Sequence, residues 1–317
     1  MRAAFLDWDS VNANDLDARC LAELPLDWTY YPKVSAAELD QLLTDTAVLV
    51  SNKVVLDAAS IARAKALRLI CVAATGTNNI DLTAAAKRDI PVCNVTAYAT
   101  DSVVQHVFML LLNLVRQQPA YQEALVRGRW QQSQHFCFLD FSIESLAGKT
   151  LGIVGYGELG RAVANMAKHF GMHVLIAQSM QGEPSKDRLP LDELLGQVDV
   201  LSLHCPLTTQ TRHLISEREL GLMKPSAILL NTARGGLVDE AALLQALDNR
   251  QIAAAGLDVL ELEPPGQDHP LLRIQRPNLV ITPHIAWASR QARQKLVNGV
   301  AANIDNWLKG KVTNRVN

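Results

Sequence analysis

The chain has 317 residues, of which 49% are hydrophobic and 20% charged, a composition typical of a folded globular protein with room for two domains of ordinary size. Its formal net charge is −2 and it contains no long basic run, which argues against nucleic acid or an anionic membrane as the main partner. The cysteines are odd in number, widely spaced and without a C-x-x-C pair. We therefore expect free thiols, no bound metal and a reducing cytoplasm. The cysteines are Cys20, Cys71, Cys93, Cys137 and Cys205.

The first 98 residues alternate short apolar runs with helical patterns. Strands are expected at "AAFLD", "WTYYP", "AVLVS", "LRLICVAA" and "PVCNV". Helices are expected over residues 11–24, 35–45, 57–66 and 80–89. This alternation predicts a parallel sheet with helices on both faces, in a smaller flavodoxin-like α/β domain. The opening "MRAAFLDWDS" has one arginine and a very short apolar run, so it predicts a strand and not a cleaved signal peptide.

The most apolar stretch, residues 103–115, is too short to cross a bilayer and contains three polar residues. It predicts a helix buried on most sides, either inside the protein or at a subunit interface. Thr100 is expected to cap this helix and Pro119 to close it. A less regular stretch follows over residues 128–148.

A second alternating series begins at residue 150. Six near-continuous apolar runs, most followed by a helical pattern, predict a Rossmann-type doubly wound parallel sheet that binds a dinucleotide. They are "TLGIVG", "HVLIA", "DVLSLHC", "AILLNTA", "AAAGLDV" and "LVITPH". The final helical segment is expected to pack back on the first domain. We therefore expect a discontinuous substrate domain of residues 1–98 and 287–317, and a dinucleotide-binding domain of residues 99–286.

The first run of this series leads into a phosphate-binding pattern. Gly155, Gly157 and Gly160 have G-x-G-x-x-G spacing, follow a predicted strand and open a predicted helix, which is the context that the pattern requires. The glycines permit the tight turn, the approach of the pyrophosphate and close helix–strand packing, in that order. The helix N-terminus supplies N–H groups to the phosphates.

The end of the next strand departs from the usual NAD-specific pattern, which places Asp or Glu there to bind the ribose. This chain has Gln178, followed by Ser179. No arginine follows immediately; Lys186 and Arg188 come later, and Glu183 partly offsets them. Both NADH and NADPH are therefore expected to work.

Polar residues also follow other strands of this series, where ligands bind in open α/β sheets. Arg234, Glu263 and His284 come from three consecutive strand ends. Hydride transfer between a 2-hydroxy acid and nicotinamide needs a proton acceptor and a cation for the carboxylate. His284 suits the first role, Glu263 orients it, and the planar fork of Arg234 suits the second. Each residue also has a structural alternative. Arg234 could form an ion pair with Asp239, and His284 could have a purely structural role. Glu263 could be a solvated loop acid, and Glu261 is a nearby rival for its role beside the histidine.

These residues lie within motifs that resemble the D-isomer-specific 2-hydroxyacid dehydrogenases over essentially the whole chain. The motifs are "ATGTNNID", "VVQHVFMLLL", "GRW", "GIVGYGELGR", "LSLHCPLT", "LNTARGGLVDE", "GLDVLELEPP" and "TPHIAWAS". "FCFLD" and "HIAWAS" suggest the glycerate dehydrogenase, or hydroxypyruvate reductase, subgroup. The resemblance implies the same three catalytic roles for Arg234, Glu263 and His284, and it prefers Glu263 to Glu261 because the family's acid directly precedes Pro.

The resemblance also implies binding residues and a partner. The backbone of the "TGT" turn, Thr75, Gly76 and Thr77, looks like the family's second anchor for the substrate carboxylate. The cofactor would be lined by Val103, Glu158, Leu159, Cys205, Pro206, Thr232, Ala233 and Asp258. Lys53 is a further candidate cation near the substrate, and Trp287 either walls the substrate pocket or packs between domains. Family members are typically dimers joined through the cofactor domain, for which residues 103–115 and Trp130 are candidates.

The leading expectation is a reductase of hydroxypyruvate or glyoxylate that uses NADH or NADPH. A dehydrogenase for another small 2-oxo acid remains an alternative within the same class. A phosphoglycerate dehydrogenase is less favoured, since only Lys53 offers an extra cation and no regulatory domain follows. A formate dehydrogenase would carry Gln in place of Glu263. A dinucleotide-sensing binding protein, like the related transcriptional corepressors, is the alternative from a different class.

Overall fold

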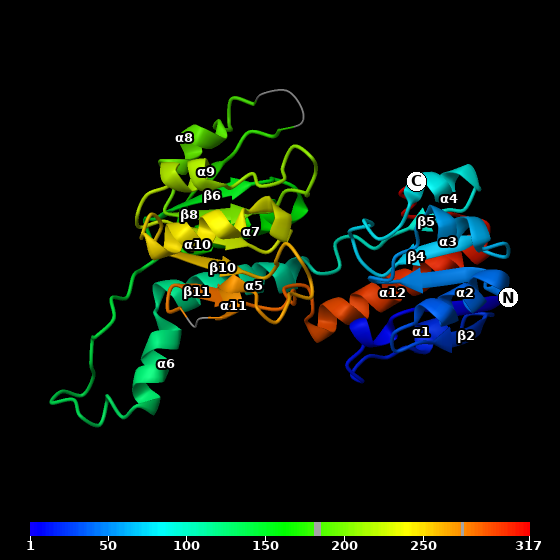
Figure 1. Cartoon of the computed structure of the whole chain (residues 1–317), viewed down its shortest axis with the longest axis horizontal. Coiled ribbons are helices and arrows are strands. Elements are labelled where there is room, and N and C mark those ends of the chain that lie inside the picture. The colour runs from blue at the N-terminus through cyan, green and yellow to red at the C-terminus, as the bar shows by residue number, and fades with distance from the viewer. Residues whose placement is uncertain (181–184, 274–275) are drawn as a thin grey trace. The chain divides into compact units, whose positions relative to one another are not determined.

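The computed structural model describes residues 1–180, 185–273 and 276–317. The chain forms two compact units: residues 1–99 with 287–317 make unit 1, and residues 100–286 make unit 2 (Figure 1). Both are built around parallel sheets, as the alternating pattern predicts.

Unit 1 contains a five-stranded sheet in the order β2-β1-β3-β4-β5, which is the order of flavodoxin-like folds. Alternate residues of each strand enter cores on opposite faces. Ala3, Val48 and Leu69 join one core with α12, while Ala4, Leu49 and Ile70 join the other. The strands are β1 (Arg2–Phe5), β2 (Asp27–Tyr30), β3 (Val48–Ser51), β4 (Leu69–Val72) and β5 (Val92–Cys93). The helices are α1 (Arg19–Ala22), α2 (Ala36–Asp45), α3 (Ala58–Arg63), α4 (Leu82–Lys87) and α12 (Arg290–Leu308).

The helix predicted over residues 11–24 is wrong for most of its length. Only α1 is α-helical there, and a short 3-10 turn, η1 (Trp8–Ser10), precedes the segment. Asn12 and Asp17 accept hydrogen bonds from the nearby backbone N–H groups of Asp15 and Arg19. Short polar side chains that bind neighbouring backbone in this way favour turns over a continuous helix.

Unit 2 contains a six-stranded parallel sheet in the order β11-β10-β9-β8-β6-β7. An isolated parallel bridge between Ala177 and Leu189 continues the sheet beyond β7. With Leu189 counted as a shortened third strand, the order becomes that of a Rossmann fold, whose switch point lies between β6 and β8. The strands are β6 (Thr150–Val154), β7 (His173–Ile176), β8 (Val200–Leu203), β9 (Ile228–Asn231), β10 (Ala254–Leu257) and β11 (Leu279–Ile281). The helices are α5 (Thr100–Val115), α6 (Gln118–Val126), α7 (Glu158–His169), α8 (Leu191–Leu195), α9 (Glu217–Leu222), α10 (Glu240–Asp248) and α11 (Pro270–Arg273).

The apolar helix is α5, which is buried along most of its length. Its predicted last residue, 115, is confirmed, but Thr100 does not cap the helix and Pro119 does not close it. Thr100 is its first helical residue, and the Thr100 hydroxyl donates to the Glu158 carboxylate. The helix ends at Val115, and Pro119 lies in the first turn of α6, where proline is tolerated because no backbone N–H is needed. Beyond α6, residues 127–149 contain no helix or strand and run away from the sheet of unit 2 (Figure 1). No helix in the described part of the chain is both long and apolar enough to cross a membrane.

Candidate active site

The G-x-G-x-x-G loop connects β6 to α7 at the switch point of the unit 2 sheet. Gly155 has a φ of +94°, and a Cβ on it would lie 2.5 Å from the backbone nitrogen of Cys205. A Cβ on Gly160 would lie 2.1 Å from the carbonyl oxygen of Gly155. The first and third positions are therefore restricted to glycine by backbone shape and by close backbone contact.

The second glycine faces open space. No atom lies within 4 Å of the place where a Cβ on Gly157 would be, and Gly157 caps α7 without a side-chain hydrogen bond. The first N–H groups of α7 thus receive no side-chain acceptor from the cap residue. Farther along the same edge of the sheet, the Thr232 hydroxyl is buried and has no hydrogen-bond partner among the described residues. Exposed helix N–H groups and an unpaired buried hydroxyl fit a phosphorylated nucleotide cofactor.

Residues beneath this loop are held neutral by burial. Cys205 follows β8, and burial raises the pKa of its thiol to about 11. The neighbouring His204 ring lies 2.8 Å from the Ser202 hydroxyl, and burial lowers the pKa of His204 to about 4. The side chains of Cys205 and His204 are therefore uncharged near neutral pH. Of the other predicted cofactor residues, Val103 is buried in α5, Leu159 and Ala233 are half-buried, and Pro206 is exposed.

Gln178 follows Ala177, the residue after β7 that forms the isolated bridge with Leu189. Its backbone N–H donates to the Leu189 carbonyl oxygen at 2.7 Å. Ser179 follows and is exposed. Glu183, which the sequence places near this edge, lies outside the described residues.

Arg234 lies three residues beyond β9, at the start of a short 3-10 turn, η2 (Gly235–Leu237). Its Nη1 donates to the Ala233 carbonyl oxygen at 2.6 Å. The alternative ion pair with Asp239 is wrong, because the Asp239 carboxylate caps α10 through the N–H groups of Ala241 and Ala242. Among the described residues, no carboxylate lies within ion-pair distance of the Arg234 guanidinium, which leaves it suited to bind an anion.

The glycine after Arg234 is required by a close backbone contact and not by its own backbone conformation. Gly235 does not have a positive φ. A Cβ on Gly235 would instead lie 1.9 Å from the carbonyl carbon of Leu260. The turn that carries Arg234 therefore lies directly against the backbone of the loop that carries Glu263.

Glu263 is the acid that contacts His284. Its Oε2 lies 2.6 Å from His284 Nδ1, and its Oε1 accepts a hydrogen bond from the Leu260 N–H at 2.9 Å. The rival Glu261 pairs with Arg212 and His213. The Glu263 carboxylate is thus fixed at both oxygens, one by backbone and one by the imidazole.

His284 has a φ of +55°, a left-handed conformation that is uncommon for a residue with a Cβ. Asp258 supports this turn: its carbonyl oxygen accepts the His284 N–H at 2.7 Å, and its carboxylate accepts the next two backbone N–H groups at 2.9 and 2.8 Å. Burial raises the pKa of Asp258, but hydrogen bonds from His106 and Thr282 and from this backbone lower it below its ordinary value overall. The sequence places Asp258 at a strand end but does not reveal this supporting contact.

Lys53 and the "TGT" turn, residues 75–77, lie beyond the carboxyl ends of β3 and β4 in unit 1. The Thr75 hydroxyl donates to the Val95 carbonyl oxygen at 2.9 Å, and the Thr77 carbonyl oxygen accepts a backbone hydrogen bond, so the "TGT" turn is held from both sides. The Lys53 N–H donates to the carboxylate of Asp7 at 2.6 Å. The Trp287 ring meets Tyr98 edge-on at 6.4 Å. These residues belong to unit 1, whereas Arg234, Glu263 and His284 belong to unit 2.

Comparison with known proteins agrees with this architecture. Residues 108–286 match the model of the D-isomer specific 2-hydroxyacid dehydrogenase NAD binding domain. The chain is 40% identical to a glycerate dehydrogenase of Methylorubrum extorquens over 99% of this chain and 98% of the relative. It is 34% identical to a hydroxypyruvate reductase of Blautia hydrogenotrophica, with both chains fully covered. A solved structure of an NADPH-dependent glyoxylate/hydroxypyruvate reductase from Sinorhizobium meliloti, in complex with NADP and malonate, has 29% identity and a TM-score of 0.83, and the match covers 99% of this chain and 96% of that one. The chain therefore belongs to the D-isomer specific 2-hydroxyacid dehydrogenase family, whose members are nicotinamide-dependent oxidoreductases.

Proposed function

We propose that this enzyme reversibly reduces hydroxypyruvate to D-glycerate, and glyoxylate to glycolate, with NADH or NADPH. The observation that carries the proposal is the 2.6 Å contact between Glu263 and His284, in the same unit as an arginine that has no carboxylate partner among the described residues. The names of the relatives, glycerate dehydrogenase and hydroxypyruvate reductase, support this choice of substrates.

Arg234 binds the carboxylate of the 2-oxo acid in this proposal. The contact with the Ala233 carbonyl oxygen uses one N–H of Nη1 and leaves the other guanidinium N–H groups to bind the substrate. A planar fork of this kind matches the two oxygens of a carboxylate. The backbone of the "TGT" turn, residues 75–77, and Lys53 provide further contacts to the same small substrate, and Trp287 limits its size.

His284 transfers the proton. Glu263 accepts the Nδ1 proton, which fixes the tautomer, so Nε2 is the atom that exchanges a proton with the substrate oxygen. His284 donates this proton during reduction and accepts it during oxidation. The bound nicotinamide supplies the hydride for reduction and accepts it in the reverse direction.

The cofactor is held by the G-x-G-x-x-G loop and by the residues at the neighbouring strand ends that include Thr232 and Asp258. Gln178 can hydrogen-bond the adenosine ribose, but it carries no charge that would repel a 2′-phosphate. Both cofactors should therefore work, with kcat/KM values within about 10²-fold of each other. Gln178→Asp should move the preference toward NADH and Ser179→Arg toward NADPH.

A steady-state panel of 2-oxo acids with both cofactors tests the proposed activity. Hydroxypyruvate and glyoxylate should give the highest kcat/KM values, measured from the loss of NADH or NADPH absorbance. A branched or aromatic 2-oxo acid that exceeds both would overturn the proposed substrate. Binding of NADH without turnover of any 2-oxo acid would favour the dinucleotide-sensing alternative.

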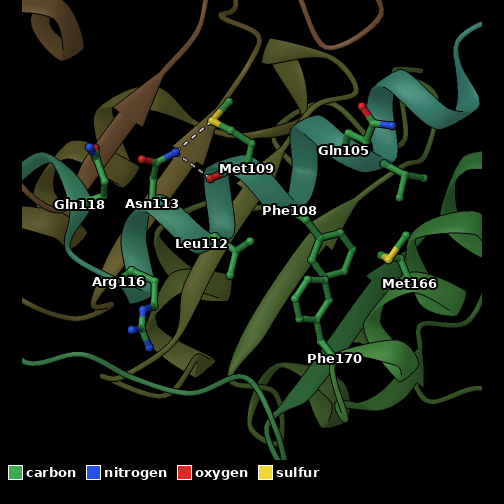
Figure 2. A pocket seen from close by; sticks show the side chains of 10 residues that line it. Gln105, Phe108, Met109, Leu112, Asn113, Arg116, Gln118, Met166 and Phe170 are labelled. Atoms are coloured by element: carbon green, nitrogen blue, oxygen red, sulfur yellow. Dashed lines mark hydrogen bonds between the residues drawn. The ribbon is translucent and has the colours of Figure 1, made fainter.

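The same unit carries surfaces that suit a homodimer joined through the cofactor domain. A largely apolar groove of about 580 Å³ lies between α5 and α7, where Phe108 and Phe170 stack with ring centroids 4.9 Å apart (Figure 2). The arm formed by α6 and residues 127–149 exposes large apolar side chains, including Phe136 at 90% and Leu139 at 79%. Exposed apolar surface of this extent marks an interaction site. In a two-fold dimer, the arm of each subunit covers the groove of the other.

Sedimentation velocity tests this assembly. The wild-type protein should sediment as a dimer, and Phe136→Asp should shift it to a monomer. Val55→Asp is a matched control, because Val55 is an exposed apolar residue of unit 1 outside the arm. A monomeric wild type, or a dimer that persists in Phe136→Asp, would contradict the proposed interface.

The enzyme is also proposed to be cytoplasmic, which agrees with five free cysteines.

A further inference from the structure

A shortened third strand brings an arginine to the adenosine end of the proposed cofactor site. The Leu189 N–H donates to the Ile176 carbonyl oxygen at 2.9 Å, and the Gln178 N–H donates to the Leu189 carbonyl oxygen at 2.7 Å. These two bonds fix Leu189 beside the end of β7. Arg188, the residue just before it, is therefore held next to the position that reads the ribose in dinucleotide-binding sheets.

The Arg188 side chain extends toward the phosphate loop. Its guanidinium carbon lies 5.9 Å from the ring centroid of Tyr156, the residue between Gly155 and Gly157. The Tyr156 backbone is held in turn, since its carbonyl oxygen accepts a hydrogen bond from Arg161 at 3.2 Å. A cation–π contact keeps a guanidinium over the ring and leaves its edge N–H groups available.

The charge of Arg188 is not neutralised within the described part of the chain. Arg188 is half-buried, and no carboxylate of the described residues lies within 4.0 Å of its guanidinium. The described acids nearest in sequence are Asp187, which is exposed, and Asp192, which pairs with Arg218. A half-buried, uncompensated cation beside a neutral glutamine favours a dianionic ligand group over a hydroxyl.

We infer that Arg188 is the residue that binds the 2′-phosphate of NADPH. It reaches this group from the shortened third strand, which differs from the expected position directly after β7. Gln178 hydrogen-bonds the ribose of either cofactor, and Arg188 adds the contact that NADPH alone can make. This inference rests on the proposed placement of the nicotinamide cofactor, and it names the residue that sets the cofactor preference.

Nucleotide binding without turnover tests this role. The probes are adenosine 2′,5′-bisphosphate and adenosine 5′-phosphate, titrated calorimetrically into the full-length protein. Arg188→Ala should weaken binding of the bisphosphate at least about tenfold and change binding of the monophosphate less than about twofold, because only the bisphosphate carries the group that Arg188 contacts. Arg188→Lys should recover part of the loss, since it keeps the charge but not the planar fork.

Lys186→Ala is the matched control. Lys186 is an exposed cation two residues away and should change the affinity for either probe less than about twofold. An unchanged ratio of the two affinities in Arg188→Ala, or an equal loss for Lys186→Ala, would overturn the inference and leave the proposed reductase activity untouched. Failure of the wild-type protein to bind either probe would overturn the cofactor placement itself.

Discussion

Gly235→Ala is the substitution that most directly tests how the active site is held together. The methyl group would lie 1.9 Å from the Leu260 carbonyl carbon and 2.0 Å from its oxygen. Ordinary contact begins near 3.4 Å, so the two backbones must separate by about 1.5 Å. The displaced segments carry Arg234 on one side and Glu263 on the other, although Gly235 itself has no side chain that reaches a substrate.

The magnitude follows from this geometry. A misplacement of about 1 Å in a catalytic group can cost about 10²-fold in rate, so kcat/KM for hydroxypyruvate should fall by at least that factor. The added methyl group should also cost about 1–3 kcal/mol of stability, as overpacking usually does. Because Glu263 Oε1 is held by the Leu260 N–H, the displacement should also disturb the contact between Glu263 and His284.

The assay is steady-state reduction of hydroxypyruvate across pH, with a thermal melt to confirm that the variant is folded at the assay temperature. Gly266→Ala is the matched control, since Gly266 lies in the facing loop, which carries Glu263, and a Cβ there meets nothing within 4 Å. The control should stay within about threefold of wild type. A folded Gly235→Ala variant with wild-type kcat/KM would refute the idea that the two loops position each other.

Five further outcomes are expected. Arg234→Lys should lower kcat/KM at least about 10²-fold, because Lys keeps the charge but loses the planar fork, and near-normal turnover would remove Arg234 from the site. His284→Ala should lower kcat/KM about 10²–10⁴-fold. Glu263→Gln should lower kcat/KM in both directions, because it removes the carboxylate that fixes the His284 tautomer, and an unchanged kcat/KM would contradict the role of Glu263. Trp287→Ala should improve longer or branched 2-oxo acids relative to hydroxypyruvate if the ring limits substrate size, whereas an unaltered preference series would indicate packing. Burial lowers the pKa of His204 to about 4, so the unfolded state, with a histidine pKa near 6.5, binds the extra proton between these pH values. The contribution of neutral His204 to the free energy of unfolding is complete above about pH 6.5 and is lost as the pH falls toward 4. The loss should be about 1–3 kcal/mol, a reduced value because the residue is partly exposed. In urea titrations, the free energy of unfolding of His204→Asn should therefore depend less on pH over this range than that of the wild type.

The strands could be predicted because a parallel sheet covered on both faces needs near-continuous apolar runs. Each apolar run that the sequence predicts as a strand, in either unit, contains a strand of the structure. Helix ends were less predictable, because they depend on contacts that sequence spacing does not show. The Thr100 hydroxyl bonds to Glu158 of another helix, and Pro119 begins a helix where the sequence suggested an end.

The candidate site was predictable as a set of residues but not as a set of supporting contacts. Arg234, Glu263 and His284 carry chemistry that is visible in their side chains. The need for glycine at position 235 arises from a backbone that is 25 residues later in the chain, and the support that Asp258 gives to His284 arises from a left-handed turn. Neither contact has a local signature, since each depends on how loops from different strands meet.

The strand register explains why the three loops start together. Asn231 of β9 is the partner of Leu257 of β10, and Leu257 is the partner of Ile281 of β11, so the three strands end level with one another. Arg234 and His284 each lie three residues beyond their strand, while Glu263 lies six residues beyond and returns through its bond to the Leu260 N–H. Because the strands end level and each residue lies three positions beyond its strand, Arg234 and His284 lie at similar heights above the sheet. The loop after β10 folds back and brings the Glu263 carboxylate to His284. A one-residue shift of register in β10 would move Glu263 by about 3.3 Å along the strand direction, which is more than the 2.6 Å contact with His284 can tolerate. The buried apolar residues that set the register of these strands are therefore part of what positions the proton-transfer pair.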